Sequence, residues 1–491
     1  MRNASEPLLF ELGRAGRGTD YLPSGASADA FVPRELLRRD LPLPELSELE
    51  VVRHFTRLSQ RTFAIDLGFY PLGSCTMKYN PKVNDALTAL PGFRDLHPFA
   101  PDALAQGALE VMYQLERALC EIFGMAAFSL NPAAGAQAEL AALLVAKAYF
   151  RERGEGAKRR TVIVPDTAHG TNPASAAMVG YRVVSLPSDA TGRVDPATLA
   201  EVLGSDTAVC MMTNPNTLGL FEDRIAEIAR LVHAAGGLMY YDGANANALM
   251  GAARPGEMGF DLMHLNLHKT FSIPHGGGGA GHGPLGVAAH LVDFLPTPVV
   301  VRRDDGYSLD FERPRSIGPV RSFWSNFAHA VRALAYIRSN GAEGLARVSQ
   351  LAILNANYLR ALIKEFLTVP YDERCRHEFV ASAQELKRRT GIRALDLAKA
   401  LLDRGFHAPT IYFPLLVPEC LMIEPTETES KETLDEFVAA LREIVALADS
   451  DPGALLAAPV TTPVGRVDET RAARQPDLRW RPPAPVAQAP G

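Results

Sequence analysis

Hydrophobic and polar positions follow two different periods along the middle of the chain. Apolar residues recur at three- and four-residue steps from Pro101 to Phe123, which predicts an amphipathic helix. Beyond it, short apolar runs alternate with helical patterns, of which 223–235 is the clearest. The runs that predict buried strands are 161–164, 181–186, 207–212, 237–241, 262–267 and 285–289. This alternation predicts an α/β fold with a largely parallel sheet, helices on both faces and a ligand site beyond the carboxyl ends of the strands.

The pattern changes at about residue 326. A long helical pattern covers 326–366, and a mixed segment after it predicts a smaller α+β domain. The helices and strands predicted in that segment are 395–404, 410–417, 420–423 and 431–447. The predicted divisions are an irregular N-terminal segment (1–100), a large domain (101–325), a small C-terminal domain (326–450) and a Pro/Ala-rich tail (451–491).

The composition is that of an ordinary globular protein. With 47% hydrophobic and 22% charged residues, a net charge of −6 and a pI near 6.1, the chain offers no basic surface for nucleic acid or an anionic membrane. No apolar run approaches the ~20 residues of a membrane-spanning helix. The first residues resemble neither a secretory signal nor a transit peptide. The five cysteines form no CxxC pair, which favours the reducing cytoplasm over a disulfide framework.

The strongest chemical signal is Lys269, in the segment NLHKTFSIPHGGGG (266–279). The lysine follows an apolar run, lies next to His268 and precedes a glycine run. A desolvated lysine loses its proton more readily and becomes a nucleophile toward an aldehyde, so this setting is typical of a Schiff-base lysine. The glycines let the backbone approach a bulky cofactor closely. Taken alone, a strand that ends in a loop with a solvated lysine explains the segment equally well.

Three segments that precede Lys269 strengthen this interpretation. The segment NPAAGAQAEL (131–140) opens an Ala-rich helical pattern, whose free N–H groups favour a phosphate. His169 follows one predicted strand and can stack on an aromatic cofactor. Asp242 follows another and can keep a pyridine nitrogen protonated. Taken singly, an ordinary helix start, a loop histidine and a helix cap explain them as well. Their order is what a pyridoxal-phosphate enzyme with an aspartate-aminotransferase-like (fold type I) large domain needs.

Two other patterns are rejected as sites. The segment GHGPLG (281–286) matches the dinucleotide fingerprint GxGxxG, but it follows a glycine run rather than a strand and has Pro284 where a helix should begin. Four histidines lie close together in the sequence without a Cys or carboxylate that completes a metal-ligand spacing, so no metal site is expected. These are His264, His268, His275 and His282.

Several long segments carry a family resemblance. They are PLGSCTMKYNP (71–81), NPAAGAQAEL (131–140), DTAHGTNPASAAMVGY (166–181), TNPNTLGLFE (213–222), YYDGANANALMG (240–251), NLHKTFSIPHGGGGAGHGPLGV (266–287) and MIEPTETESKETLDEF (422–437). They resemble glycine dehydrogenase (aminomethyl-transferring), the P-protein of the glycine cleavage system, in the form of its separate C-terminal subunit. The similarity extends to TTPVGRVDETRAARQPDLRW near the end, which implies that the tail is ordered and docked.

The resemblance implies a function. A member of this family binds pyridoxal 5'-phosphate (PLP), decarboxylates glycine, transfers the aminomethyl group to the lipoyl group of the H-protein and releases carbon dioxide. It also implies an N-terminal-half partner (subunit 1) in an α2β2 assembly.

The resemblance further implies roles for particular residues. Lys269 would carry the cofactor, Asp242 would pair with the pyridine nitrogen, and His169 would stack on the ring; these three are the predicted catalytic residues. The other predicted cofactor contacts are Gly135, Ala136, Asn266 and His268 at the phosphate, and Asn214 and Asn245 near the phenolic oxygen.

Two alternative functions stay open from the sequence. The first is another fold type I enzyme, such as an amino-acid decarboxylase or a desulfurase, which would need a mobile nucleophilic cysteine; Cys375 and Cys420 have poor contexts for that role. The second is a non-catalytic partner subunit, against which the joint presence of Lys269, Asp242 and His169 argues.

Other residues are expected to be structural. Arg313, Arg315 and Arg321 flank a Pro/Gly-rich turn and are candidates for binding the glycine carboxylate, but structural ion pairs are favoured. Cys75 is interpreted as a small packed residue rather than a redox-sensitive thiol.

Overall fold

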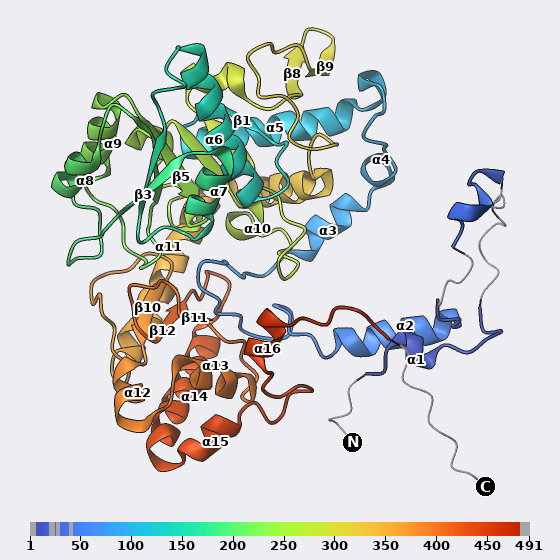
Figure 1. Cartoon of the computed structure of the whole chain (residues 1–491), viewed down its shortest axis with the longest axis vertical. Helices are drawn as coiled ribbons and strands as arrows, with labels where there is room; N and C mark the ends of the chain where they lie inside the picture. Colours follow the sequence, from blue (N-terminus) through green and yellow to red (C-terminus); the bar gives the residue numbers. More distant parts are fainter. Residues whose placement is uncertain (1–5, 19–24, 26–29, 39–42, 482–491) are drawn as a thin grey trace. The chain divides into compact units, whose positions relative to one another are not determined.

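The structure is a computed structural model that describes residues 6–18, 25, 30–38 and 43–481. The chain divides into two compact units, Met1–Phe63 with Leu456–Gly491, and Ala64–Leu455. The second unit holds nearly all of the secondary structure and every predicted site residue (Figure 1).

A seven-stranded sheet forms the centre of the larger unit, with the strand order β1-β7-β6-β5-β4-β2-β3. The strands are β1 (Ala127–Ser129), β2 (Thr161–Pro165), β3 (Arg182–Leu186), β4 (Thr207–Thr213), β5 (Leu238–Gly243), β6 (Leu262–Leu265) and β7 (Leu285–Val287). The strands from β3 through β6 are parallel, whereas β7 is antiparallel to both of its neighbours. The predicted largely parallel sheet is therefore confirmed, with β7 as the exception.

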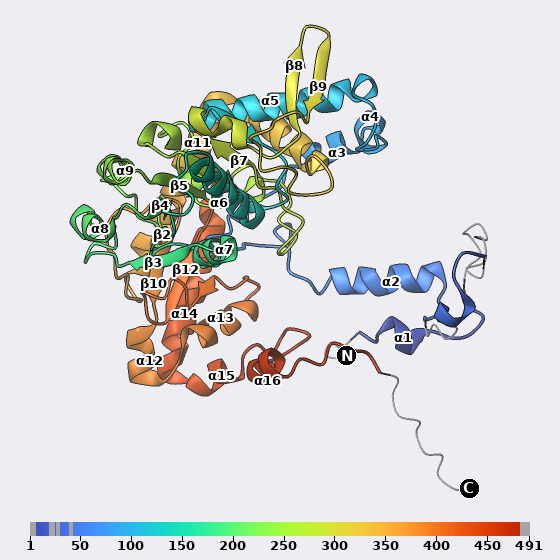
Figure 2. The same ribbon diagram turned by 45° about the horizontal axis from the view of Figure 1, so that its top comes forward.

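Alternate residues of the strands face two different cores. In β4, Val209 and Met211 lie in one hydrophobic cluster and Cys210 and Met212 lie in the other. Helices cover both faces because each face is apolar (Figure 2). On one face lie α6 (Gly135–Glu152) and α7 (Thr171–Val179), and on the other lie α5 (Gln106–Phe123), α8 (Pro196–Val202), α9 (Ile225–Ala234) and the first half of α11 (Phe327–Ile363).

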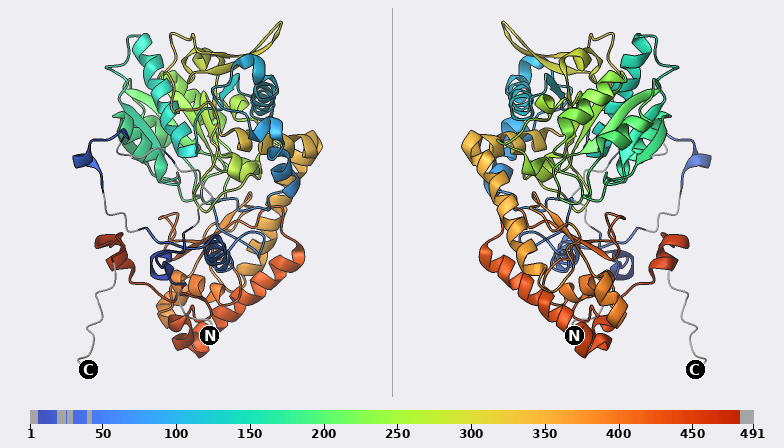
Figure 3. Two further views of the ribbon diagram at one scale, coloured as in Figure 1. Left: turned by 90° about the vertical axis from the view of Figure 1, so that its right-hand side faces the viewer. Right: turned by 90° about the vertical axis from the view of Figure 1, so that its left-hand side faces the viewer.

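The smaller part of this unit is built on a three-stranded antiparallel sheet of order β10-β12-β11. Helix α11 contacts both parts of the unit, packing on α5 at one end and on α14 and β10 at the other (Figure 3). The elements of the smaller part are β10 (Phe379–Ser382), α12 (Gln384–Thr390), α13 (Ala394–Leu402), β11 (Thr410–Ile411), β12 (Cys420–Ile423) and α14 (Lys431–Ser450). The predicted strand over 410–417 is wrong beyond Ile411, because Tyr412 has a positive φ of 60° and breaks the extended run.

Several elements escape the hydrophobic pattern because they are short or mostly polar. They are α3 (Lys82–Thr88), α4 (Pro91–Arg94), α10 (Leu267–Thr270), α15 (Pro452–Ala457), and the hairpin of β8 (Val299–Arg303) with β9 (Gly306–Asp310), which projects at the top of Figure 2. None of the helices in the described part of the chain is long and apolar enough to cross a membrane.

The unit of Met1–Phe63 with Leu456–Gly491 contains helices where the sequence predicted an irregular N-terminal segment and a Pro/Ala-rich tail. These are α1 (Leu9–Leu12), α2 (Glu48–Ser59) and α16 (Glu469–Arg474). Helix α2 begins with a capping box in which the Ser47 hydroxyl accepts from the Glu50 N–H and Glu50 accepts from the Ser47 N–H. This Ser-x-x-Glu signal was available in the sequence and marks the start of the helix.

Candidate active site

The carboxyl ends of the central strands converge on one cavity of about 510 Å³. His169 follows β2, Asp242 is the last residue but one of β5, and Lys269 lies in α10 just after β6. The predicted site residues that line the cavity are Gly135, Ala136, His169, Asp242, Asn266, His268 and Lys269. The fold therefore brings together residues that are up to 134 positions apart, as the parallel sheet leads one to expect.

Lys269 offers an amine to this cavity. Its backbone N–H bonds to the Asn266 carbonyl at 2.9 Å, which holds the side chain in the first turn after β6. Among the described residues, its ammonium makes no hydrogen bond or ion pair, although its charge reaches several groups around the cavity. An amine that is half-buried and without a fixed partner is available for covalent attachment to an aldehyde.

Asp242 and His169 are paired directly. The Asp242 Oδ2 lies 2.9 Å from Nδ1 of His169, and the other ring nitrogen of His169 lies 3.0 Å from the Ser74 hydroxyl. Asn172 donates to the same carboxylate oxygen at 3.1 Å. Burial alone would raise the pKa of Asp242, but the charges of His169 and His264 and these hydrogen bonds lower it well below its usual range. Asp242 is therefore a buried anion that faces the cavity.

The start of α6 has the features of an anion-binding helix start. No side chain caps this 18-residue helix, so its first N–H groups are free to face the cavity at Gly135 and Ala136. A Cβ at Gly135 would lie 2.5 Å from Nδ2 of Asn266, so only glycine fits there. The Asn266 side chain in turn contacts Nε2 of His268 at 3.2 Å. Burial and the charge of Lys269 lower the pKa of His268 to about 2, which keeps this imidazole neutral.

Two family models match the chain. The model for the aminotransferase class-V family matches residues 135–279, and the model for the glycine dehydrogenase C-terminal domain matches residues 348–451. The first match covers the cavity from the start of α6 to the glycine run, and the second covers most of the smaller part of the unit.

Curated relatives match almost the whole chain. "Probable glycine dehydrogenase (decarboxylating) subunit 2" of Desulforamulus reducens is 56% identical over 484 residues, which is 97% of this chain and 100% of the relative. The protein of the same name from Thermotoga maritima is 53% identical over 474 residues, 96% of this chain and 99% of the relative. The chain belongs to the glycine dehydrogenase subunit 2 family. The resemblance found in the sequence motifs is thus confirmed.

Solved structures share the fold of this glycine dehydrogenase family member. A glycine decarboxylase (P-protein) of the glycine cleavage system, in inhibitor-bound form, matches with a TM-score of 0.74 and 24% identity over 87% of this chain and 100% of that chain. The sphingosine-1-phosphate lyase of Burkholderia pseudomallei matches with a TM-score of 0.60 and 16% identity, over 89% of this chain and 96% of that chain. Together with the class-V match, these likenesses confirm the predicted α/β fold of the PLP-dependent fold type I class.

In this glycine dehydrogenase family member, Asn214 and Asn245 do not line the cavity. Both are fully buried. Asn214 accepts from the Glu222 N–H at 3.0 Å, and Asn245 donates to the Pro215 carbonyl at 2.9 Å and to Glu378 at 3.1 Å. Their contact with the phenolic oxygen of a cofactor stays a prediction.

Sequence reasoning missed Glu139 as a cavity residue. It lies in the first turns of α6 and accepts from the Asn172 amide at 2.6 Å, so Asn172 links it to Asp242. Burial and the charge of Asp242 raise the pKa of Glu139 to about 7. The available signal was its position, four residues after Gly135 on a helix whose start had already been recognised.

Cys75 also lines the cavity, and its neighbour Ser74 bonds to His169. Burial is the main cause that raises the pKa of the Cys75 thiol, so it is not an activated thiolate. Nothing in the local sequence around residue 75 indicated that this segment returns to the strand ends.

The cysteines that a desulfurase would need are buried and inert. Cys375 and Cys420 are 2% and 0% exposed, and burial raises the pKa of each thiol to about 12. Two of the arginine candidates form ion pairs: Arg313 with Asp310 and Asp293, and Arg315 with Glu152 and Asp293. These contacts agree with the structural interpretation of both residues. Arg321 donates to Asn326 at 2.7 Å.

Proposed function

We propose that this chain binds PLP covalently through Lys269 and catalyses glycine decarboxylation, transferring the aminomethyl group to the lipoyl group of an H-protein with release of carbon dioxide. One observation carries the proposal: the free amine of Lys269, the Asp242–His169 pair and the uncapped start of α6 face a single cavity. The proposed limits of the PLP-binding domain remain 101–325, and those of the smaller domain 326–450.

The residues present fit the cofactor. The uncapped helix start, Asn266 and neutral His268 supply donors without a competing acid, as a phosphate requires. The low pKa of Asp242 keeps this carboxylate negative, as a protonated pyridine nitrogen requires. When bound, PLP supplies an electron sink for the bond that breaks at the substrate carbon.

The chain's own side chains orient and hold protons. Lys269 would form the covalent link, Asp242 would hold a proton at the ring nitrogen, and His169 would lie against the ring, oriented by Asp242 and Ser74. The raised pKa of Glu139, which is buried beside Asn172, would keep this carboxyl group partly protonated near neutral pH and so limit the negative charge beside Asp242.

A partner subunit is part of the proposal, because the relatives are named as subunit 2. Helix α2 presents a broad exposed apolar face, which is typical of a protein interface. It consists of Leu49, Val52, Phe55 and Leu58, which are 54%, 55%, 55% and 37% exposed. We propose that subunit 1 covers this face in an α2β2 assembly. Five free thiols fit a reducing cytoplasm as its location.

The experiment that tests the activity uses the purified chain mixed with subunit 1, a lipoylated H-protein and glycine. We expect exchange of labelled bicarbonate into the glycine carboxyl group, and borohydride reduction should fix PLP to the peptide that contains Lys269. A complex in which the label maps to another residue, or that exchanges no bicarbonate, would contradict the proposal. A colourless complex that binds no PLP would favour the scaffold alternative.

The partner interface is tested with a matched pair of substitutions on α2. Phe55→Ser should weaken association with subunit 1 about tenfold or more, because the interface would lose a phenylalanine side chain that the complex buries. Arg53→Ser, also exposed on α2, is the control. Analytical ultracentrifugation measures both. Equal affinities for the two variants would place the interface elsewhere.

A further inference from the structure

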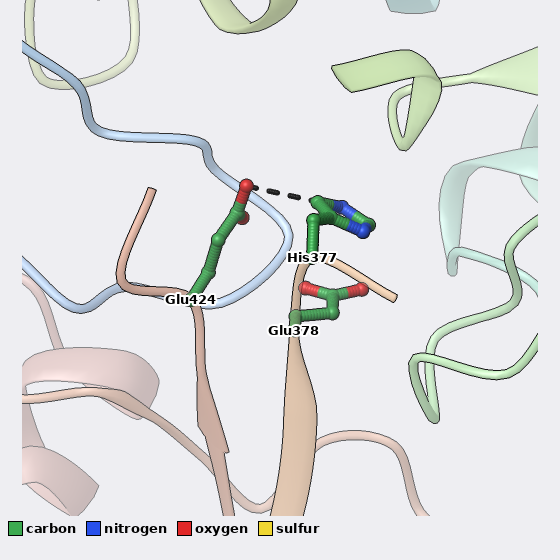
Figure 4. Close-up of side chains that lie close together, drawn as sticks. All are labelled: His377, Glu378 and Glu424. Atoms are coloured by element: carbon green, nitrogen blue, oxygen red, sulfur yellow. Dashed lines mark ion pairs between the residues drawn. The ribbon is translucent and has the colours of Figure 1, made fainter. Parts of the chain in front are cut away.

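Three buried titratable side chains meet behind the cavity. His377 and Glu378 precede β10, and Glu424 follows β12; Figure 4 shows the three side chains close together, with the contact between Glu424 and His377 dashed. Their nearest ligand-type atoms all lie within 4.8 Å of one another, and each residue is 0% exposed. Neither the sequence motifs nor the proposed function gives these residues a role.

The two glutamates hold the loop Ser74–Thr76. The Ser74 N–H donates to Glu378 Oε2 at 2.7 Å, and the Thr76 N–H donates to Glu424 Oε2 at 2.9 Å. The Thr76 hydroxyl lies 2.6 Å from Glu424 Oε1. Ser74 and Thr76 have positive φ values of 59° and 47°, which side chains rarely adopt, so the carboxyl groups fix a strained backbone.

The rest of the loop lies against β12. The Gly73 N–H donates to the Met422 carbonyl at 3.3 Å, and the Glu424 N–H donates to the Pro71 carbonyl at 3.2 Å. A Cβ at Gly73 would lie 2.3 Å from Cγ of Met422, so the chain approaches as closely as only glycine allows. Ser74 then places its hydroxyl 3.0 Å from His169. The glutamates thus act on the cavity through Ser74.

Two carboxylates that are buried so close together are not both ionised, so one of the two glutamates carries a proton. Burial, and in Glu378 the charge of Glu424, raise the pKa of both carboxyl groups, that of Glu378 well above its ordinary value and that of Glu424 to about 7, so the pair holds a proton. His377 does not compensate them, because burial and the charge of Lys269 lower its pKa to about 3 and its Nε2 lies 3.8 Å from Glu424. The other titratable groups that act on the pair are Lys269, Lys78, Cys75 and Cys420.

The hydrogen bonds identify the proton's site. Both oxygens of Glu378 accept from N–H groups, those of Ser74 and the Asn245 amide, which cannot accept a proton in return. Oε1 of Glu424 faces the Thr76 hydroxyl, which can donate or accept. We propose that Glu424 is a neutral carboxylic acid, that Glu378 is an anion, and that together they are positioning residues that set the loop Ser74–Thr76 against His169.

A divalent metal ion is the competing explanation for the same three residues. A metal would need both carboxylates ionised, and a metal-bound imidazole donates its second N–H to an acceptor. Neither ring nitrogen of His377 has a hydrogen-bond partner among the described residues. The hydrogen-bond pattern therefore favours a proton on Glu424 over a metal ion.

The proposal rests on the proposed function only for its effect on catalysis, so its test has readouts on the chain alone. The infrared spectrum of the cofactor-free chain should contain a protonated-carboxyl band that Glu424→Gln removes. Thr76→Val, which keeps the branched shape but removes the hydroxyl acceptor, should shift that band. A spectrum in which Glu424→Gln leaves the band unchanged would overturn the assignment, as would one stoichiometric divalent metal ion in the purified chain.

Matched glutamine variants test the positioning role in the complex with subunit 1. Glu424→Gln can donate to the Thr76 hydroxyl and should lower kcat by less than about threefold. Glu378→Gln must turn an NH2 toward an N–H donor, so it should lower the melting temperature of the chain, weaken the visible circular dichroism of bound PLP and lower kcat roughly tenfold or more. Equal effects of the two variants would overturn the proposal. If wild-type complex shows no glycine exchange at all, the proposed function fails while the infrared result still stands.

Discussion

Two buried groups of histidines and carboxyls lie on either side of the loop Ser74–Thr76, and their charges are set in opposite directions. At the strand ends, imidazoles and amide donors surround Asp242 and lower its pKa. Beside β10 and β12, Glu378 and Glu424 face each other, and their pKa values rise. All three carboxyls are almost fully buried. Burial alone therefore does not decide the charge of a carboxyl group; its nearest partner does.

Because their pKa values differ in direction, the two groups suit different tasks. A carboxylate that stays negative can hold a proton on a cofactor ring. A pair in which one carboxyl group is protonated carries one negative charge instead of two and can hold a backbone in place. Ser74 connects the two groups, since its N–H binds Glu378 and its hydroxyl binds His169.

The largest effect should come from Lys269→Ala, which removes the cation whose charge acts on both groups. The variant should lose the covalent link to PLP and its visible absorbance, and activity should fall roughly a thousandfold or more. Lys158→Ala, at an exposed lysine, is the control. Absorbance spectra and glycine exchange measure both. Retained absorbance and turnover would refute the role of Lys269.

Asp242→Asn should have the next largest effect on activity. The neutral amide cannot hold the ring proton, so kcat/KM should fall about a hundredfold, while some PLP remains bound. Asp305→Asn, at an exposed aspartate, is the control. A near-wild-type rate would mean that the charge at position 242 is not the feature that distinguishes the two groups.

Glu139 gives a pH-dependent test of how the charges around the cavity are set. Its pKa is raised from an ordinary value near 4.5 to about 7. Because the pKa of Glu139 is higher in the folded state than in the unfolded state, the stability that this group contributes is fully present below its unfolded-state pKa. The contribution is lost as pH rises through 7. Glu139→Gln does not titrate, and its amide can still accept from Asn172. Its unfolding free energy should match that of wild type near about pH 4.5 and exceed it by about 3 kcal/mol near pH 8. Denaturant unfolding at the two pH values measures this, and a pH-independent difference would contradict it.

Ser74→Ala should lower kcat less than Lys269→Ala or Asp242→Asn does. The loop and both carboxyls remain, but His169 loses one hydrogen bond, so kcat should fall roughly three- to tenfold. Ser205→Ala, at an exposed serine, is the control. No change in kcat would show that the two groups act independently.

Much of the fold follows from the hydrophobic pattern. The strands from 161 to 265 were predicted because each contains several apolar residues that pack into the two apolar cores. By contrast, β1 and β10, which have three and four residues, were not predicted, because they are too short for a period to define. The equally short β7 was predicted within the run 285–289, but its orientation was not. The antiparallel orientation of β7 depends on the chain reversal at 276–284, where glycines carry no hydrophobic signal.

The residues of the candidate site also divide into those that the sequence predicted and those that it did not. Lys269, Asp242, His169 and Gly135 were predicted because each follows a strand or opens a helix, where parallel topology places ligands. Ser74, Cys75 and the glutamates were not, because their roles depend on contacts between distant segments. No local spacing indicates that residue 74 reaches His169 or that Glu378 and Glu424 face each other.

The loop Ser74–Thr76 also has a consequence for how the protein is made. Its carboxyl partners lie 304 and 348 positions further along the chain. During synthesis from the N-terminus, the central sheet emerges well before Glu378 and Glu424 do. The strained turn has no acceptors until then, so the nascent chain cannot complete this wall of the cavity before most of its length has left the ribosome. Truncated chains that end before residue 424 should therefore form the sheet but not the finished cavity.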